Sequence, residues 1–210
     1  MVNAIILAAG RGSRLKGFFN KPKCLIKLGK DNLTLLERTY NNLKDSSIET
    51  INIITGYKHR DVYKILKKKV SYIHYKNYRK TNNLQTLLYA KKLLNTSFIC
   101  LFADIIYEKK IIKKLLRNKN DVCLVIDTSK VLEGTMRVII KNNKIIDIGS
   151  HIKVSEAHGN FIGIAKFSNI GSKILKKYLL KEKNNYKDYY TQALRKMIVN
   201  GQNIGYTNIQ

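Results

Sequence analysis

The residues with the clearest chemical potential lie in one short segment near the start of the chain. An apolar run, Ala4–Leu7, leads into Ala8-Ala9 and then into Gly10-Arg11-Gly12-Ser13-Arg14, which alternates glycine with cations. Small residues let backbone N–H groups approach an anion, and the arginines can neutralise its charge. Pro22, the only proline, is followed by a further cation, Lys23. This pattern predicts a buried strand that ends in a polyanion-binding loop, and a triphosphate suits such a loop best.

Two better-known phosphate loops do not fit this segment. A P-loop needs Lys and then Ser or Thr directly after its second glycine, and Gly12 is not followed by them. The dinucleotide fingerprint needs a third glycine where this chain has Leu15. The pattern Leu-Ala-Ala-Gly-x-Gly-x-Arg-Leu over residues 7–15, followed by Pro22-Lys23, resembles instead that of the sugar-phosphate nucleotidyltransferases. A generic strand–turn–helix rich in Gly and Lys is the alternative, and the fixed spacing of the two cations argues against it.

The resemblance implies roles for particular residues. This family joins a nucleoside triphosphate to a phosphorylated small molecule, and its catalytic cations match Arg14, on the leaving phosphates, and Lys23, between the reacting phosphates. The phosphocholine cytidylyltransferase-like branch carries an Asn-Asn pair beside the nucleotide, which matches Asn82-Asn83, although these residues can equally cap a helix. The backbone of residues 7–10 would read the base. The implied nucleotide-binding residues are Leu7, Ala8, Ala9, Gly10, Arg11, Gly12, Ser13, Arg14, Lys23, Thr81, Asn82 and Asn83.

Asp104 is the candidate metal ligand. It follows the apolar run Ser97–Ala103, so we expect it at the carboxyl end of a buried strand, where ligands of open α/β sheets bind. Carboxylate oxygens suit Mg²⁺, and the family holds its catalytic metal on the matching aspartate. A helix-entry carboxylate ahead of Glu108 is the alternative. Relatives end in a short strand with a second metal-binding aspartate, and this sequence stops at Gln210 before it. We therefore expect either a truncated form of a longer protein, or a naturally shortened protein with weak or no activity.

The acceptor side is expected in the second half of the chain. The segment Glu133–Phe167 resembles the acceptor half of the same branch, although Ser150 follows Ile148-Gly149 where relatives often carry a lysine. Tyrosine faces and carboxylates are the groups that hold a quaternary ammonium. Asp188 could equally cap the helix predicted to begin near Tyr186. The candidate acceptor-binding residues are Glu156, Asp188, Tyr189 and Tyr190.

Composition restricts the possible settings and partners. The net charge of +26 points either to a nucleic-acid binder or to drift toward lysine, and we favour drift because the lysines alternate with apolar positions in predicted helices. The charge would still attract anionic substrates. The three cysteines and four histidines show no metal spacing, which predicts reduced thiols and a cytoplasmic setting. Apolar runs are too short for a membrane span, and the start does not read as a signal peptide.

The order of predicted elements defines a fold class. In residues 1–117, a nucleotide-binding half, strands are predicted over 2–7, 50–55, 70–75 and 97–103, and helices over 34–44, 61–69 and 81–94. This alternation predicts right-handed crossovers and a parallel sheet. In residues 118–210, an acceptor-side half, strands are predicted over 121–127, 160–167 and 203–207, a hairpin over 135–148, and helices over 169–181 and 186–199. We expect a single Rossmann-like α/β domain, with helices on both faces of an open, mostly parallel sheet and a small antiparallel extension.

The sequence therefore predicts a Mg²⁺-dependent nucleotidyltransferase. We expect CMP to pass from CTP to a phosphorylated small molecule, such as phosphocholine or a related phosphate or phosphonate, with release of pyrophosphate. Two polyanions must meet, so catalysis would consist mainly of positioning and charge neutralisation. Three alternatives stay open: uridylyl or guanylyl transfer to a sugar 1-phosphate, a nucleic-acid-binding module, and an inactive relative that only binds nucleotide.

Overall fold

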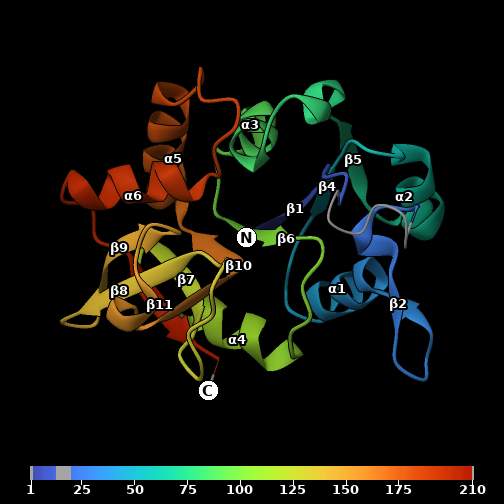
Figure 1. The fold of residues 1–210 in the computed structure, drawn as a ribbon. Coiled ribbons are helices and arrows are strands. Elements are labelled where there is room, and N and C mark those ends of the chain that lie inside the picture. The colour runs from blue at the N-terminus through green and yellow to red at the C-terminus, as the bar shows by residue number, and fades with distance from the viewer. Residues whose placement is uncertain (1, 13–19, 210) are drawn as a thin grey trace.

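The computed structural model describes residues 2–12 and 20–209, which form a nine-stranded mixed sheet flanked by helices (Figure 1). Its central strand, β1 (Asn3–Ala8), lies between β4 (Ile51–Thr55) and β6 (Phe98–Phe102) and is parallel to both. Strand β5 (Ser71–His74) continues the parallel arrangement beside β4. The predicted parallel sheet is confirmed, and the carboxyl ends of these strands meet at one edge.

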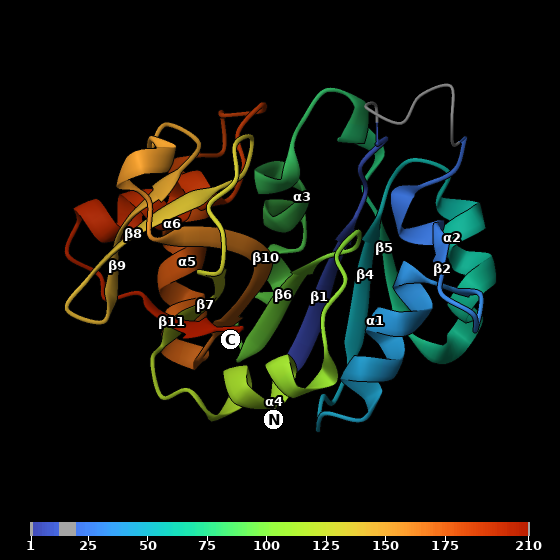
Figure 2. The same ribbon diagram turned by 60° about the horizontal axis from the view of Figure 1, so that its bottom comes forward.

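Helices cover both faces of the sheet because neighbouring residues of β1 point to opposite sides. Ala4, Ile6 and Ala8 belong to a core shared with α1 (Leu35–Lys44), α2 (His59–Leu66) and α4 (Lys109–Arg117). Ile5 and Leu7 belong to a second core, shared with α3 (Asn83–Tyr89), α5 (Asn169–Lys181) and α6 (Thr191–Val199). Figure 2 shows α1 and α4 in front of the sheet. The expected helices on both faces are therefore confirmed.

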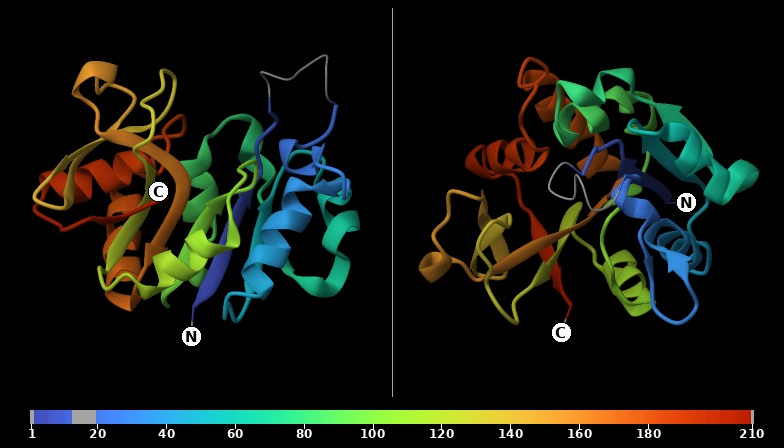
Figure 3. Two further views of the ribbon diagram at one scale, coloured as in Figure 1. Left: turned by 90° about the horizontal axis from the view of Figure 1, so that it is seen from below. Right: turned by 45° about the vertical axis from the view of Figure 1, so that its right-hand side comes forward.

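The second half of the chain adds strands of mixed direction. Strand β10 (Gly159–Phe167) is antiparallel to both β6 and β7 (Val122–Asp127), and it curves between them (Figure 3). Strand β11 (Gly205–Asn208) is parallel to β7 at the outer edge. The predicted hairpin is present as β8 (Arg137–Lys141) and β9 (Lys144–Gly149), which are antiparallel. One sheet thus runs through both halves.

Local signals explain several boundaries. The Thr34 hydroxyl accepts a hydrogen bond from the Glu37 amide at 3.1 Å, and Glu37 Oε2 accepts one from the Thr34 amide at 2.8 Å, which is the capping box expected at the start of α1. Asn142 and Asn143 both have positive φ, 49° and 56°, as the turn of a two-residue hairpin requires. A short pair, β2 (Lys27–Leu28) and β3 (Leu33–Thr34), precedes α1.

Five short 3₁₀ helices complete the described elements, which are η2 (Lys23–Leu25), η3 (Lys67–Lys69), η4 (Lys76–Arg79), η5 (Lys91–Leu93) and η6 (Val154–Glu156). Two predicted helices differ from the structure. Helix α3 ends at Tyr89, and η5 follows where the helix was expected to continue. Helix α6 begins at Thr191 and not near residue 186, because the carbonyls of residues 183–188 accept hydrogen bonds from α3.

None of the described helices has both the length and the apolar composition that a membrane crossing requires. Cys24, Cys100 and Cys123 are free and buried, in agreement with the expected reduced thiols. Burial raises the pKa of the Cys24 and Cys100 thiols to about 12, so both stay protonated near neutral pH. Protonated, buried thiols are poor nucleophiles, so neither Cys24 nor Cys100 is a candidate catalytic nucleophile.

Candidate active site

A cleft of about 560 Å³ lies at the carboxyl ends of β1 and β6, and Tyr189 is the one described lining residue from the second half of the chain. Twelve of the predicted site residues line it, namely Leu7, Ala8, Ala9, Gly10, Arg11, Gly12, Lys23, Thr81, Asn82, Asn83, Asp104 and Tyr189. Two further predicted residues, Ser13 and Arg14, lie outside the described part of the chain. The fold therefore gathers residues as far apart in the sequence as Leu7 and Tyr189 around one hollow.

The end of β1 is held by its neighbours on both sides. The Leu7 carbonyl accepts a hydrogen bond from the Ala103 amide at 3.3 Å, and the Ala9 carbonyl accepts one from the Tyr57 amide at 3.1 Å. Gly56 permits this approach, because a Cβ there would lie 2.7 Å from the Ala9 carbonyl oxygen. The loop that follows reaches the cleft with small side chains, so its backbone is accessible to a ligand.

Lys23 and Asp104 face each other across the cleft. Lys23 begins η2, directly after Pro22, and its Nζ lies 3.6 Å from Asp104 Oδ2. Both side chains are partly exposed, at 31% and 42%, and an ion pair in such a setting is worth little. The ammonium can therefore exchange this partner for a phosphate oxygen at small cost.

Gly12 allows the loop to pack directly on Lys23. Its φ is +62°, a conformation that side chains other than glycine rarely adopt, and a Cβ there would lie 2.8 Å from Lys23 Cγ. The glycine-rich loop thus performs two tasks. It presents backbone to the cleft, and it gives the Lys23 side chain its space.

The charge of the described cleft lining is strongly positive. Arg11, Lys23 and Arg79 supply three cations, and Asp104 is the one carboxylate among the described lining residues. Arg79 is partly fixed, since its Nε donates a hydrogen bond to the Tyr78 hydroxyl at 3.3 Å. This balance suits a ligand with several negative charges.

The side chains of Asn82 and Asn83 both make hydrogen bonds within the protein. Asn82 is the N-cap of α3, and its Oδ1 accepts a hydrogen bond from the Asn83 amide at 2.9 Å, so the capping role is confirmed. Asn83 Oδ1 accepts a hydrogen bond from the Tyr190 amide at 2.8 Å. Because this contact uses Oδ1, the Nδ2 group of the Asn83 side chain remains available to a ligand in the cleft. Thr81 Oγ1 lies 3.0 Å from the Tyr75 hydroxyl, beside the pair.

The candidate acceptor residues do not all reach the cleft. Tyr189 lines it, but Tyr190 is completely buried and packs edge-to-face against Phe102 and Phe161, so its expected contact with an acceptor is wrong for this structure. Asp188 is not the helix cap that we considered, because Tyr190 occupies the N-cap position of α6 and no side chain caps it. Glu156 is exposed in η6, outside the described lining of the cleft.

Sequence reasoning missed several residues that line the cleft, namely Pro22, Cys24, Tyr78, Arg79, Thr86, Phe102 and Ala103. Arg79 and Tyr78 directly precede the predicted nucleotide residue Thr81, and a cation and an aromatic ring beside that residue were a usable signal. Phe102 was hidden because it reads as a core residue. Gly163, with φ +88°, leaves room for its ring, since a Cβ there would lie 2.3 Å from Phe102 Cδ2.

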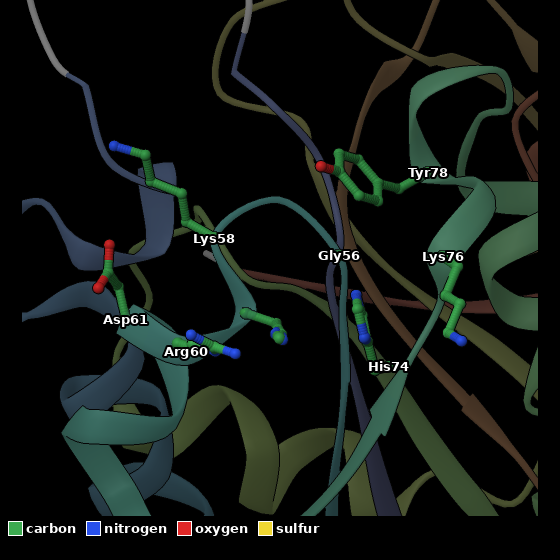
Figure 4. Close-up of a pocket in the computed structure, with 8 residues that line it drawn as sticks. Gly56, Lys58, Arg60, Asp61, His74, Lys76 and Tyr78 are labelled. Carbon is green, nitrogen blue, oxygen red and sulfur yellow. The ribbon is translucent and has the colours of Figure 1, made fainter.

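A second hollow, of about 440 Å³, shares Tyr78 with the first cleft (Figure 4). His59 and His74 meet there, with ring centroids 3.9 Å apart, although the sequence showed scattered histidines. Burial, followed by the charges of His59 and Lys76, lowers the pKa of His74. The Lys58 ammonium turns away and donates to the Asn20 carbonyl at 2.6 Å. The glycine loop and Asp104 are outside this hollow, so the first cleft is the candidate active site.

The side chains of the cleft fit a magnesium ion that is held by few protein ligands. No group of three or more His, Cys, Asp or Glu side chains within the described ranges could enclose a metal. Mg²⁺, however, is commonly held by one or two carboxylates together with substrate phosphates and water. Asp104, partly exposed and next to the cations of the cleft, matches such a site.

Comparison with known proteins gives one family and consistent relatives. A model described as the MobA-like NTP transferase domain matches residues 4–139. The chain is 30% identical over 188 residues to CTP:phosphoglutamine cytidylyltransferase from Campylobacter jejuni, covering 80% of this chain and 73% of that protein. It is 32% identical over 155 residues to choline-phosphate cytidylyltransferase from Haemophilus influenzae, covering 71% of this chain and 64% of that protein.

Solved structures show the same fold. The inositol-1-phosphate CTP transferase from T. maritima superposes with a TM-score of 0.81 at 18% identity, covering 100% of this chain and 86% of that one. The CTP:phosphocholine cytidylyltransferase from Streptococcus pneumoniae also gives 0.81, at 22% identity, covering 100% of this chain and 90% of that one. At such identities the likeness establishes the architecture, a mostly parallel sheet with helices and a small antiparallel part.

Proposed function

We propose that this chain, which belongs to the MobA-like NTP transferase family and is an enzyme of the nucleotidyltransferase class, transfers CMP from CTP to a phosphorylated small molecule. Two relatives support the choice of nucleotide, since both are named as cytidylyltransferases. The observation that carries the proposal is the pair Lys23 and Asp104, 3.6 Å apart in a cationic cleft at the end of β1.

The acceptor is proposed to carry a phosphate or phosphonate group. The names of the relatives give phosphoglutamine and choline phosphate as acceptors of those proteins, and both contain a phosphate. In this chain Tyr78 and Tyr189 border the cleft, and aromatic faces favour a cationic head group. A small zwitterion with a phosphate at one end and an ammonium at the other would suit both the cations and the rings.

The proposed reaction is a direct displacement. An oxygen of the acceptor phosphate attacks the α-phosphorus of CTP and forms a new P–O bond, while the bond to the β-phosphate breaks and pyrophosphate leaves. The nucleophile is already an anion, so no protein base is needed. Lys23 would bridge the α-phosphate and the acceptor phosphate as charge builds, and Arg11 and Arg79 would neutralise the other phosphates.

Other residues would orient the nucleotide. The backbone of residues 7–10 and the Asn83 amide would face the base and sugar, because all of them border the cleft. Arg14, which lies outside the described residues, keeps its proposed role on the leaving phosphates. Asp104 would hold Mg²⁺, which when bound supplies positive charge to the triphosphate.

A substrate screen tests this proposal. The chain is incubated with Mg²⁺, one of the four ribonucleoside triphosphates, and one acceptor from a panel of phosphocholine, aminoethylphosphonate, sugar phosphates and polyol phosphates. Pyrophosphate release is the readout, and reactions without acceptor are the control. We expect acceptor-dependent release with CTP. Release only with UTP or GTP and a sugar 1-phosphate would contradict the proposal, as would the absence of release with the whole panel.

A further inference from the structure

The segment between α5 and α6, residues 183–190, is attached to the first turn of α3 and is here called the 183–190 loop. Two backbone hydrogen bonds join them, from the Asn82 amide to the Tyr186 carbonyl at 2.7 Å and from the Leu84 amide to the Asp188 carbonyl at 3.3 Å. Asn82 Nδ2 adds a third, to the Lys187 carbonyl at 3.1 Å. The start of α3 thus makes its hydrogen bonds to a loop about a hundred residues away in the chain.

Gln85 extends this attachment from a place outside the cleft. Its side chain is buried, with 8% of the residue exposed, and its Nε2 donates to the Lys183 carbonyl at 2.8 Å and lies 3.3 Å from the Asn185 carbonyl. Gln85 is not among the described residues that line the cleft. Gln85 can therefore affect a ligand only indirectly, and its side-chain hydrogen bonds run to the 183–190 loop.

Both ends of the 183–190 loop are fixed independently. At its start the buried carboxylate of Glu182 accepts hydrogen bonds from Lys196 and from the Asn185 amide group. At its end Tyr190 is buried against aromatic rings of the core. Between these anchors the Tyr189 side chain is 39% exposed and lines the cleft. Tyr189 therefore lies next to the buried Tyr190, at the end of a stretch whose carbonyls are held by Asn82, Leu84 and Gln85.

We propose that Gln85 is a positioning residue for the acceptor, which it serves by holding the 183–190 loop so that Tyr189 forms the acceptor wall of the cleft. This inference rests on the proposed function, because it assigns an acceptor to that wall. Replacement of Gln85 by methionine keeps the volume of the side chain but removes the donor for two loop carbonyls. The loop would then sample more positions, and Tyr189 would no longer be presented in one geometry.

Kinetics give the first test. With CTP and the panel acceptor that supports turnover, Gln85→Met should raise the KM for the acceptor about fivefold to tenfold, since one lost hydrogen bond costs about 1 kcal/mol. The KM for CTP should not change. Gln202→Met, in the turn after α6 and outside the described lining of the cleft, is the matched control and should change neither KM. An equal rise in both KM values would indicate a general structural defect and would overturn the inference.

A second test does not require turnover. The chain contains no tryptophan, so Tyr189→Trp introduces a single fluorescent reporter at the wall. Adding Gln85→Met should increase quenching of this tryptophan by acrylamide at least about twofold, because a looser loop exposes the ring more often. Unchanged quenching would overturn the inference and leave the proposed function standing. Increased quenching in a protein that is inactive with every acceptor would refute the proposed function and not the attachment of the loop.

Discussion

The two walls of the cleft are built on different principles. The proposed nucleotide wall consists mainly of the end of β1, the glycine loop and η2, which lie within the first 25 positions of the chain. Asp104 at the end of β6, Arg79 and Asn83 complete it. The acceptor wall consists of Tyr189 on the 183–190 loop, which hydrogen bonds from α3 hold in place. The position of the first wall is determined mainly by where strands end, and the position of the second is determined by contacts between residues distant in the sequence.

This difference shows where chemistry and specificity can reside. Arg11 and Asp104, which are proposed to act on the triphosphate, closely follow the ends of β1 and β6, and these strands are anchored in the sheet. A loop held by side-chain hydrogen bonds can be changed by a few substitutions without disturbing the sheet. We therefore expect variants of the nucleotide wall to lose rate, and variants of the acceptor wall to lose acceptor affinity or stability.

Tyr190 and Tyr189 are neighbours with opposite roles, and their alanine variants should show the largest contrast. Tyr190→Ala should lower the free energy of unfolding by about 3–5 kcal/mol, because it removes a buried ring from the core. Tyr189→Ala should change stability by less than about 1 kcal/mol and should raise the KM for the acceptor. Urea denaturation and steady-state kinetics measure the two effects. Similar stability losses for both variants would contradict the assignment of Tyr190 to the core and of Tyr189 to the cleft.

Lys23→Ala should have the largest effect on rate. We expect kcat to fall about 10²–10³-fold, because a charge aimed at the transition state typically contributes that much. The affinity for CTP, measured by calorimetry, should fall much less. Lys27→Ala is the control, since Lys27 is exposed in β2 outside the described lining of the cleft. Loss of CTP affinity with an intact rate at saturation would show that Lys23 only binds substrate.

Gly12→Ala should disturb the nucleotide wall through Lys23. The new Cβ would meet the Lys23 side chain at 2.8 Å and would also strain a backbone with φ +62°, at about 1–2 kcal/mol for the strain. Gly134→Ala is a matched control, because its φ is +70° but its Cβ would have nothing within 4 Å. We expect both variants to lose similar stability, and Gly12→Ala alone to lose activity. Equal activity in the two variants would contradict the described contact with Lys23.

A weaker effect is expected at Asp147, a β9 residue whose carboxylate accepts a hydrogen bond from Arg195 of α6. Burial alone would raise the pKa of Asp147. Hydrogen bonds from His151, Arg195 and the Ile148 amide nevertheless hold this pKa below its usual value. A lowered carboxyl pKa adds stability at pH above about 4 and loses it as the pH falls through the folded-state pKa. Asp147→Asn should lower Tm by about 1–3 °C at neutral pH, as for a partly exposed ion pair.

The pH dependence of that difference is the check. Melting curves of the wild type and Asp147→Asn should converge as the pH is lowered below the folded-state pKa of Asp147, because the wild-type carboxyl is then protonated in both states. A difference that stayed constant over the whole range would show that the charge of Asp147 is not involved.

The sequence predicted well which early residues line the cleft, because the signals for them are local. The apolar run before Gly10, the capping box of Thr34 and Glu37, and the position of Asp104 after a buried strand all depend on neighbouring residues. The turn at Asn142-Asn143 was predicted for the same reason. The ends of β1 and β6 then place Gly10 and Asp104 at one edge of the sheet.

The acceptor wall could not be predicted in the same way. Tyr189 and Tyr190 are identical and adjacent, and only packing against Phe102 and Phe161 decides which one is buried. The 183–190 loop read as the start of a helix, because its hydrogen-bond partners lie about a hundred residues earlier in the chain. Likewise, the periodicity of Gly159–Phe167 identifies a strand but not its antiparallel place between β6 and β7.

In the proposed reaction, the α-phosphorus of CTP is joined to a phosphate oxygen of the acceptor within the cleft. Phosphorus NMR of the chain with CTP, Mg²⁺ and the acceptor panel follows this step on every phosphorus atom. We predict that the triphosphate signals decline together while pyrophosphate and two mutually coupled signals of a new phosphoanhydride appear, and that Lys23→Ala suppresses all of these changes. Hydrolysis of CTP without the coupled pair, or unchanged CTP with every acceptor, would contradict the account.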